Sequence, residues 1–146
     1  MDQQEICQWI PHRPPMLLVD RVSEWSETTL RAEKTFRPEE FFFQGHYPEF
    51  PLVPGVVLCE CAAQAAAVLL AKRAIEAPGV PVLTRLNDVR FKRLVRPGDT
   101  LVIDVVLDEQ LKNAFYLSAI GRVDQQIAFR LSLACTVAQP QLESDS

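Results

Sequence analysis

The most constraining feature of this 146-residue chain is the apolar run from Val56 to Ala71, in which only Glu60 and Gln64 are strongly polar. A helix that is apolar on all sides has to be enclosed by the rest of the protein, so the run predicts a central helix. Residues four apart lie one above the other on a helix, which places the carboxyl group and the amide on one wall of the interior. A carboxylate in apolar surroundings lowers its desolvation cost by staying protonated or by finding hydrogen-bond partners. We therefore identify Glu60 as a candidate proton donor and Gln64 as its candidate partner.

The segment before this helix supplies a candidate base and a candidate anion site. Pro54 and Gly55 fit the opening of the helix, because proline is tolerated at the first position and glycine lets another group approach the free N–H groups. That end of a helix attracts negative charge. His46 lies on a proline-stiffened loop, and an imidazole suits proton abstraction near neutral pH. The alternatives are a structural histidine and a polar pair that only fixes the helix position.

The rest of the chain predicts a mainly antiparallel sheet. A short helical turn over residues 3–10 precedes an irregular proline-rich segment, in which we expect His12 to be structural. Strands are predicted over residues 16–25, 28–36, 82–91, 100–107, 115–122 and 127–137, with turns at 96–99 and around Gly121. Two strands, a long helix and four strands fit an α+β fold whose sheet wraps around the helix. We expect one domain over residues 1–138 and a polar tail over 139–146.

Composition excludes several classes of protein. Hydrophobic residues make up 48% of the chain and charged residues 23%, which is typical of a folded globular domain. The acidic, polar start is unlike a secretion signal, and the apolar run falls short of the roughly 20 residues that cross a bilayer, so we expect a cytoplasmic protein without a membrane span. Four cysteines without a C-x-x-C motif and two histidines predict neither disulfide nor metal site. Nucleotide binding has no glycine-rich loop to support it.

Basic residues are concentrated between Arg85 and Arg96, in a chain whose net charge is −4. A local basic patch on an acidic protein favours an acidic partner, and the alternative is a solvated strand face. Nucleic acid is disfavoured by the overall charge. The candidate docking residues are Arg90, Lys92, Arg93 and Arg96.

Three blocks of the sequence resemble one known family. Residues 45–64 read Gly-His-Tyr-Pro-x-x-Pro-x-x-Pro-Gly-Val-x-x-x-Glu-x-x-x-Gln and closely resemble the signature of the (3R)-hydroxyacyl-acyl carrier protein dehydratases of bacterial fatty-acid synthesis, the FabZ type. The stretch Pro-His-Arg-Pro-Pro-Met-Leu-Leu-Val-Asp-Arg-Val at 11–22 resembles the family's opening block, and Phe91 with residues 96–99 resembles its block after the helix. Glu49 replaces the usual glycine and Tyr47 the usual phenylalanine, and Cys59 and Cys61 are less typical of the helix.

The resemblance implies a hot-dog fold, a curved antiparallel sheet around one long central helix, and reversible dehydration of (3R)-3-hydroxyacyl thioesters to trans-2-enoyl thioesters. It makes His46 the base at C2 and Glu60 the acid that protonates the departing hydroxyl, with Gly55 N–H holding the thioester oxygen and Gln64 orienting Glu60. It implies no cofactor beyond the pantetheine of the acyl carrier protein or CoA thioester. The residues expected to line the substrate site are Phe43, Tyr47, Pro54, Val56 and Phe91.

The resemblance also implies a homodimer joined edge to edge, or a trimer of such dimers, in which each site takes His46 from one subunit and Glu60 from the other. A basic patch would then suit the acidic acyl carrier protein. Two other functions remain open on the residues alone. One is a hot-dog acyl thioesterase that uses Glu60 to activate water, and the other is an acyl-thioester-binding protein without catalysis.

Overall fold

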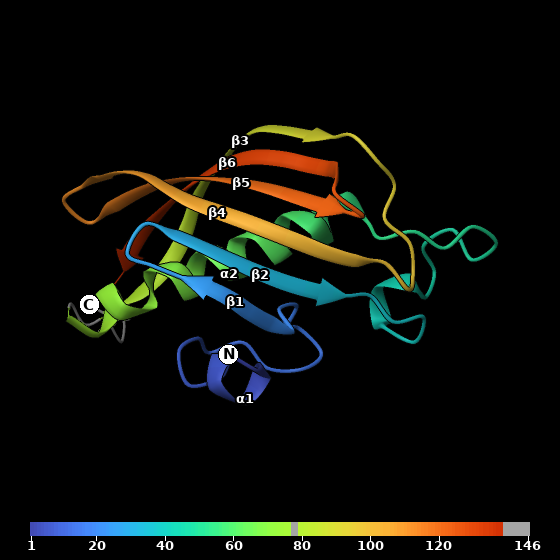
Figure 1. Ribbon diagram of the computed structural model, residues 1–146, viewed down its shortest axis with the longest axis horizontal. Coiled ribbons are helices and arrows are strands. Elements are labelled where there is room, and N and C mark those ends of the chain that lie inside the picture. The colour runs from blue at the N-terminus through green and yellow to red at the C-terminus, as the bar shows by residue number, and fades with distance from the viewer. Residues whose placement is uncertain (77–78, 139–146) are drawn as a thin grey trace, which may run out of the picture.

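A computed structural model of the chain describes residues 1–76 and 79–138, so the predicted polar tail at 139–146 lies outside the described residues. The sheet is antiparallel throughout, in the order β1-β2-β4-β5-β6-β3, and it curves around the helix α2 (Figure 1). The elements are α1 (Gln3–Ile6), β1 (Arg21–Trp25), β2 (Thr29–Thr35), the 3₁₀ turn η1 (Phe41–Phe43), α2 (Gly55–Glu76), β3 (Val80–Phe91), β4 (Thr100–Leu111), β5 (Ala114–Val123) and β6 (Gln126–Ala138). The predicted α+β arrangement of a curved sheet around one helix is confirmed.

The helix α2 forms the centre of the core because its sequence combines small and branched apolar residues. Ala62, Ala65, Ala66 and Val68 have no exposed surface, and the short alanine side chains let the sheet approach the helix closely. By length and composition, Gly55–Arg73 could cross a membrane, but 56% of that window is buried inside the protein. The length of the apolar run therefore does not by itself exclude a membrane-spanning helix, because α2 extends over 22 residues. Its enclosure by the sheet identifies it as a core helix.

The predicted strand over residues 16–25 is wrong in its first half, because β1 begins only at Arg21. Leu18 N–H donates to the Gln64 side chain at 2.7 Å, and Met16 carbonyl accepts from the same side chain at 2.7 Å. Backbone groups that a strand would use in its ladder are thus paired with a side chain of α2. This segment is held against the helix instead of joining the sheet.

The turn predicted around Gly121 is also wrong, because Gly121 is a buried residue inside β5. The pairing of β5 with β6 shifts register between Gly121 and Arg122, and a Cβ on Gly121 would lie 2.1 Å from Cε1 of Phe129. Glycine is needed there for space at a bulge. The chain reverses at Asp124 and Gln125, whose φ angles of 50° and 69° suit a two-residue hairpin turn.

The strand β3 forms one edge of the sheet and carries apolar side chains that remain exposed. It has 12 residues and pairs with β6 on one side. Val82, Leu83, Leu86 and Phe91 are 39–51% exposed. A long apolar edge is a ready template for pairing with another chain, and soluble proteins rarely leave one uncovered.

Candidate active site

His46 is presented by the loop between η1 and α2, and its ring orientation is set by the backbone. Gly45 has a φ of +79°, and His46 N–H points to the Phe43 carbonyl at 3.4 Å. The ring atom Nδ1 lies 3.2 Å from the carbonyl oxygen of Leu52. Because a carbonyl oxygen only accepts hydrogen bonds, Nδ1 carries the ring proton and Nε2 keeps a lone pair. The half-buried His46 is therefore in the tautomer that a base at Nε2 requires.

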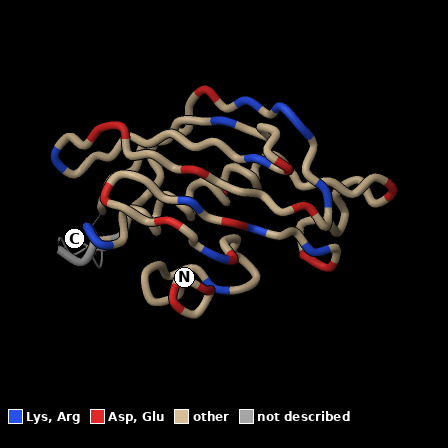
Figure 2. The backbone as a smooth tube through the Cα atoms, viewed as in Figure 1, with Lys and Arg blue, Asp and Glu red and all other residues tan. Residues whose placement is uncertain are grey.

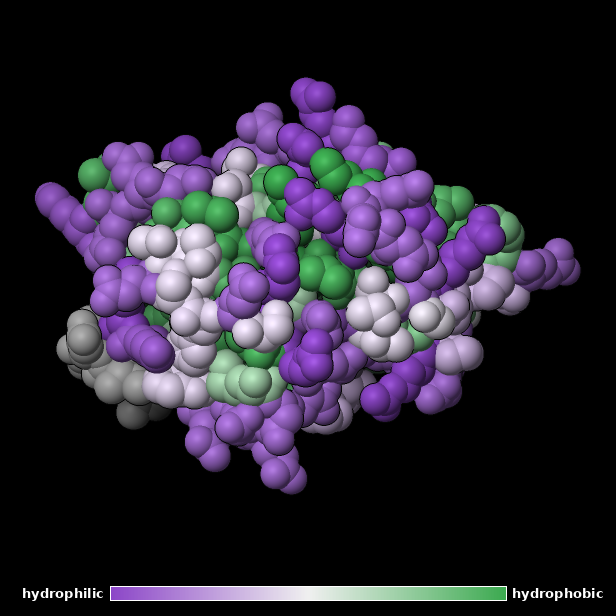
Figure 3. Space-filling model, in the orientation of Figure 1, coloured by the Kyte–Doolittle hydropathy of each residue, from purple (hydrophilic) through white to green (hydrophobic). Residues whose placement is uncertain are grey.

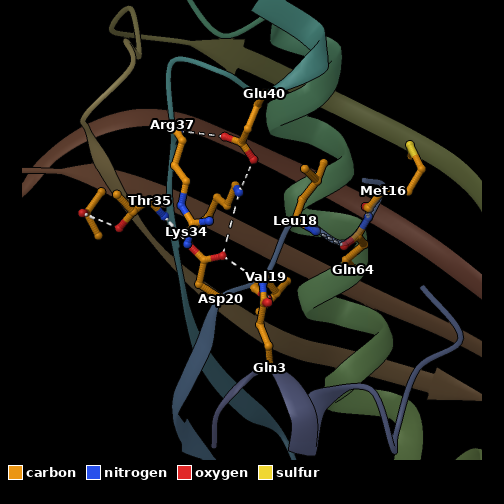
Figure 4. A network of polar contacts seen from close by, with 11 residues as sticks. Gln3, Met16, Leu18, Val19, Asp20, Lys34, Thr35, Arg37, Glu40 and Gln64 are labelled. Carbon is orange, nitrogen blue, oxygen red and sulfur yellow. Dashed lines mark hydrogen bonds and ion pairs between the residues drawn. The ribbon is translucent and has the colours of Figure 1, made fainter. Parts of the chain in front are cut away.

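The approach to this loop is fixed by a buried ion pair that sequence analysis missed. Lys34 lies on β2 in phase with the apolar residues, and its side chain is only 4% exposed. Its ammonium group pairs with Glu40 and lies 3.8 Å from Asp20, while the second Glu40 oxygen accepts from Arg37 N–H at 2.9 Å (Figure 4). A buried charge needs such partners. Since Glu40 directly precedes η1, the pair holds the start of the segment that leads to His46.

Glu60 and Gln64 adopt the arrangement that their spacing predicts, one turn apart on α2. Gln64 is 1% exposed, and its Nε2 donates to Glu60 Oε1 at 3.0 Å and to the Met16 carbonyl at 2.7 Å. Its Oε1 accepts from Leu18 N–H at 2.7 Å (Figure 4). All three bonds fix the amide orientation, because only the NH₂ group can donate and only the oxygen can accept. Gln64 thereby fixes one oxygen of the Glu60 carboxyl group.

The expectation that Glu60 is enclosed in the interior is wrong for the single chain. The side chain of Glu60 is 35% exposed, and Val56 on the first turn of α2 is 78% exposed. The sheet covers the later turns of the helix but leaves its opening uncovered. The catalytic candidates are therefore on an open face of the described chain.

His12, which we expected to be structural, lies beside Glu60. Its Nε2 is 3.9 Å from Glu60 Oε1, and its Nδ1 is buried without a hydrogen-bond partner among the described residues. The two residues are 48 positions apart in the chain, so no local pattern indicates the contact. The signal that could have found it is the position of His12 in the opening block of the family resemblance.

Gly55 opens α2 and is required there for space. A Cβ at this position would lie 2.8 Å from Cζ of Phe91, so glycine lets the aromatic ring lie against the start of the helix. Pro54 directly precedes the helix, one residue before the predicted position, and its carbonyl accepts from the N–H groups of Val57 and Leu58 at 2.9 and 3.3 Å. The exposed ring of Phe91 thus lies against the first residue of the helix.

The five expected substrate residues differ in exposure, and Pro54 is half-buried. Tyr47, Val56 and Phe91 are 63%, 78% and 51% exposed, and they belong to the His46 loop, the opening of α2 and the end of β3. Tyr47 also packs edge-on to the His46 ring, with centroids 4.7 Å apart. Phe43, in contrast, is 6% exposed and packs in the core against Phe42. Phe43 therefore supports the loop from inside the core, whereas Tyr47, Val56 and Phe91 are exposed at the surface.

The structure brings together two of the four candidate docking residues. Arg93 donates to the Val123 carbonyl at 3.1 Å and to Gln126 at 2.9 Å, so it is held by the β5–β6 turn. The Arg96 guanidinium lies over the ring of Phe50, 5.0 Å from its centroid. Figure 2 shows the basic residues along β3 and the loop that follows it. Arg90 and Lys92 line a depression of about 710 Å³ in the sheet, together with Arg130 on β6.

The four cysteines are free thiols with no sign of ligand chemistry. Burial raises the pKa of Cys59 and Cys61, and it raises the pKa of Cys135 to about 11. A thiol with a raised pKa is a poor nucleophile and metal ligand near neutral pH. Among residues 1–76 and 79–138, no group of three or more His, Cys, Asp or Glu side chains could hold a metal ion.

A curved antiparallel sheet around one core helix, with a histidine loop at the opening of that helix, defines a hot-dog protein. The fold agrees with solved structures. The dehydratase heterocomplex ApeI:P from Xenorhabdus doucetiae superposes with a TM-score of 0.77 at 19% identity, covering 92% of this chain and 91% of that one. The E. coli PaaI protein superposes with a TM-score of 0.65 at 16% identity, covering 79% and 80%.

The sequence places the chain more narrowly within that class. The FabA-like domain matches residues 10–132. The 3-hydroxyacyl-[acyl-carrier-protein] dehydratase FabZ of Petrotoga mobilis is 42% identical over 127 residues, covering 87% of this chain and 91% of that protein. The enzyme of the same name from Aromatoleum aromaticum is 42% identical over 141 residues, covering 94% and 97%. The chain therefore belongs to the FabA-like family, which confirms the resemblance found in its motifs.

Proposed function

We propose that this protein is a 3-hydroxyacyl-[acyl-carrier-protein] dehydratase of fatty-acid biosynthesis, working in the cytoplasm as one domain over residues 1–138. It removes water reversibly from (3R)-3-hydroxyacyl thioesters to give trans-2-enoyl thioesters. The observation that carries the proposal is a histidine with a free Nε2 and a glutamate oriented by an amide, in a chain 42% identical to enzymes of that name.

In the proposed mechanism, His46 Nε2 takes a proton from C2 of the substrate. The electron pair moves toward the thioester carbonyl, whose oxygen gains negative charge and accepts a hydrogen bond from Gly55 N–H. As the C2–C3 double bond forms, the C3–O bond breaks and Glu60 gives its proton to the departing hydroxyl, which leaves as water. The chemistry uses two proton transfers and no redox step. It therefore needs no cofactor beyond the pantetheine arm that carries the acyl group.

We infer that the enzyme is a homodimer joined along β3, the simplest assembly that would cover the apolar edge strand. Pairing the edges of two copies would bury Val82, Leu83 and Leu86 and continue the sheet. The same contact would cover the open face around Val56 and Glu60. A trimer of dimers would be built from this unit, and each site would combine His46 of one subunit with Glu60 of the other.

The shared site can be tested by mixing two inactive variants. His46→Ala and Glu60→Gln should each lower turnover by about a hundredfold, because general acid–base groups contribute roughly that much. After co-refolding, about half of the dimers are heterodimers by random pairing, and one of their two sites has both intact groups. The mixture should regain roughly a quarter of wild-type activity. If activity stays at the sum of the parents after subunit exchange is verified with tagged chains, each subunit works alone.

The reaction itself is tested with crotonyl and longer enoyl thioesters. Hydration, the reverse reaction, removes the enoyl absorbance without releasing thiol, whereas a thioesterase would release free thiol that a thiol reagent detects. A protein that only binds the thioester would do neither. Wild-type protein should consume the enoyl absorbance, and the Glu60→Gln variant is the matched control.

We infer further that Arg90 and Lys92 receive the acidic acyl carrier protein. They are exposed, and no partner on the described chain holds them as Arg93 is held. The face shown in Figure 3 is predominantly hydrophilic, with apolar side chains in small separate patches. Such a surface favours electrostatic steering of a charged partner over a large hydrophobic contact.

A further inference from the structure

We propose that His12 is a positioning residue for Glu60, holding the carboxyl group of its own subunit through the N–H of Nε2. The inference rests on the proposed role of Glu60 as the acid. It adds a residue to which neither the motif chemistry nor the family resemblance assigned a part in the reaction. The proposal concerns the rate of the chemical step, because His12 lies against the acid.

The contact between the two side chains is electrostatic in this conformation. His12 Nε2 lies 3.9 Å from Glu60 Oε1, which is ion-pair range and longer than a hydrogen bond. The same oxygen accepts a hydrogen bond from Gln64 at 3.0 Å. Both side chains are about one-third exposed, so water screens the attraction in the single chain. Cover from a second subunit over this open face would strengthen it.

The two ring nitrogens of His12 have different surroundings, which assigns the tautomer. Nδ1 is buried and has no hydrogen-bond partner among the described residues. A lone pair on Nε2 would face a carboxyl oxygen and be repelled, so the neutral ring carries its proton on Nε2. Since Nδ1 has no partner to exchange a proton with, the ring offers no path for a proton relay. His12 therefore acts on the position and charge of Glu60 and does not resupply its proton.

The segment that carries His12 is anchored on both sides. Arg13 donates to the carbonyls of Ile10 at 2.8 Å, His12 at 2.7 Å and Cys7 at 2.9 Å, which fixes the backbone at the histidine. Further along, Gln64 binds Met16 and Leu18 (Figure 4). One segment thus supplies His12 and is itself bound by the amide that orients the acid. The ring is held where it faces Glu60 without depending on bound substrate.

This arrangement predicts an effect on turnover more than on binding. When Glu60 gives its proton to the departing hydroxyl, negative charge develops on its carboxyl group. An N–H aimed at that group stabilises the charge as it forms, so the contact is stronger in the transition state than in the ground state. A loss of this contact should lower kcat and leave KM nearly unchanged.

The experiment compares three variants of the full-length protein with 3-hydroxybutyryl-pantetheine as substrate. His12→Gln places an amide N–H near the position of Nε2, His12→Asn reaches only as far as Nδ1, and His12→Leu keeps bulk without a donor. We expect kcat to fall about tenfold in the Asn and Leu variants, as for the loss of an electrostatic contact to a charge that develops in the transition state, with KM within about twofold of wild type. The Gln variant should recover most of the rate. If the Leu variant does not fold, the comparison of the Gln and Asn variants still tests the positioning role of His12.

A double-variant comparison separates this inference from the proposed function. In a Glu60→Gln background, His12→Asn should cause no further loss of kcat, because the group on which His12 acts is gone. A further tenfold loss in that background, or an equal loss in the Gln and Asn variants, would overturn the positioning role. If Glu60→Gln alone keeps normal turnover, the proposed acid is wrong, which is a different outcome.

Discussion

Gln64→Met tests whether the Gln64 amide both stabilises the fold and orients the candidate acid Glu60. Methionine has about the same length and flexibility as glutamine but neither a strong donor nor a strong acceptor. The substitution removes the hydrogen bonds to Leu18 N–H, the Met16 carbonyl and Glu60. It should therefore destabilise the fold and slow the reaction together.

The loss in free energy of unfolding depends on whether water can reach the groups that lose their hydrogen bond to Gln64. Leu18 is 2% exposed, so its N–H loses its partner away from water, at a cost of about 1–3 kcal/mol. Met16 is 46% exposed, so water can reach its carbonyl and that loss is smaller. Burial of a more apolar side chain offsets about 1 kcal/mol. The net decrease in the free energy of unfolding should be about 2 kcal/mol.

Urea unfolding at one fixed protein concentration measures this loss, since the stability of the proposed dimer would depend on concentration. With a slope of roughly 2 kcal/mol per molar, the midpoint should fall by about 1 M. Gln4→Met, at an exposed position of α1, is the matched control and should shift the midpoint little. Turnover should fall about tenfold, because one donor to Glu60 is lost. If Gln64→Met and Gln4→Met unfold at the same urea concentration, the amide is not a structural clamp.

Three further perturbations test separate parts of the structure. Gly121→Ala should lower the free energy of unfolding by about 1–3 kcal/mol, because the new methyl group would clash with the ring of Phe129. In a Phe129→Leu background the same substitution should lower it much less, and equal losses in the two backgrounds would exclude the clash as the cause. Reversing the charge at Arg90 and Lys92 should raise KM about tenfold for substrates on acyl carrier protein but not for acyl-pantetheine, and equal effects on both would contradict the docking surface. Burial raises the pKa of Cys135 to about 11, so its thiol stays protonated in the folded protein at pH 9. Iodoacetamide should therefore label Cys135 at least about tenfold more slowly in the folded protein than after unfolding in urea, and equal rates would contradict the burial of the thiol.

Much of the architecture could be predicted from the sequence, because the relevant signals are local. The apolar run with Glu60 and Gln64 predicts a core helix, and the four-residue spacing predicts that their side chains meet, as they do at 3.0 Å. Strand alternation predicts β2 and the four strands after the helix. These features depend on the 3.6-residue period of a helix or the two-residue period of a strand, and residues close together in the sequence are enough to show either period.

The tertiary structure decided the contacts that join distant segments. Gln64 draws residues 16–18 out of a strand, Lys34 finds Glu40 and Asp20, and Gly121 marks a bulge against Phe129 where a turn was expected. The meeting of His12 with Glu60 is of the same kind. Each depends on strand register and on the path of the N-terminal segment across α2, which no local repeat encodes. Local periodicity therefore determined which residues face inward, and long-range packing determined which of them meet.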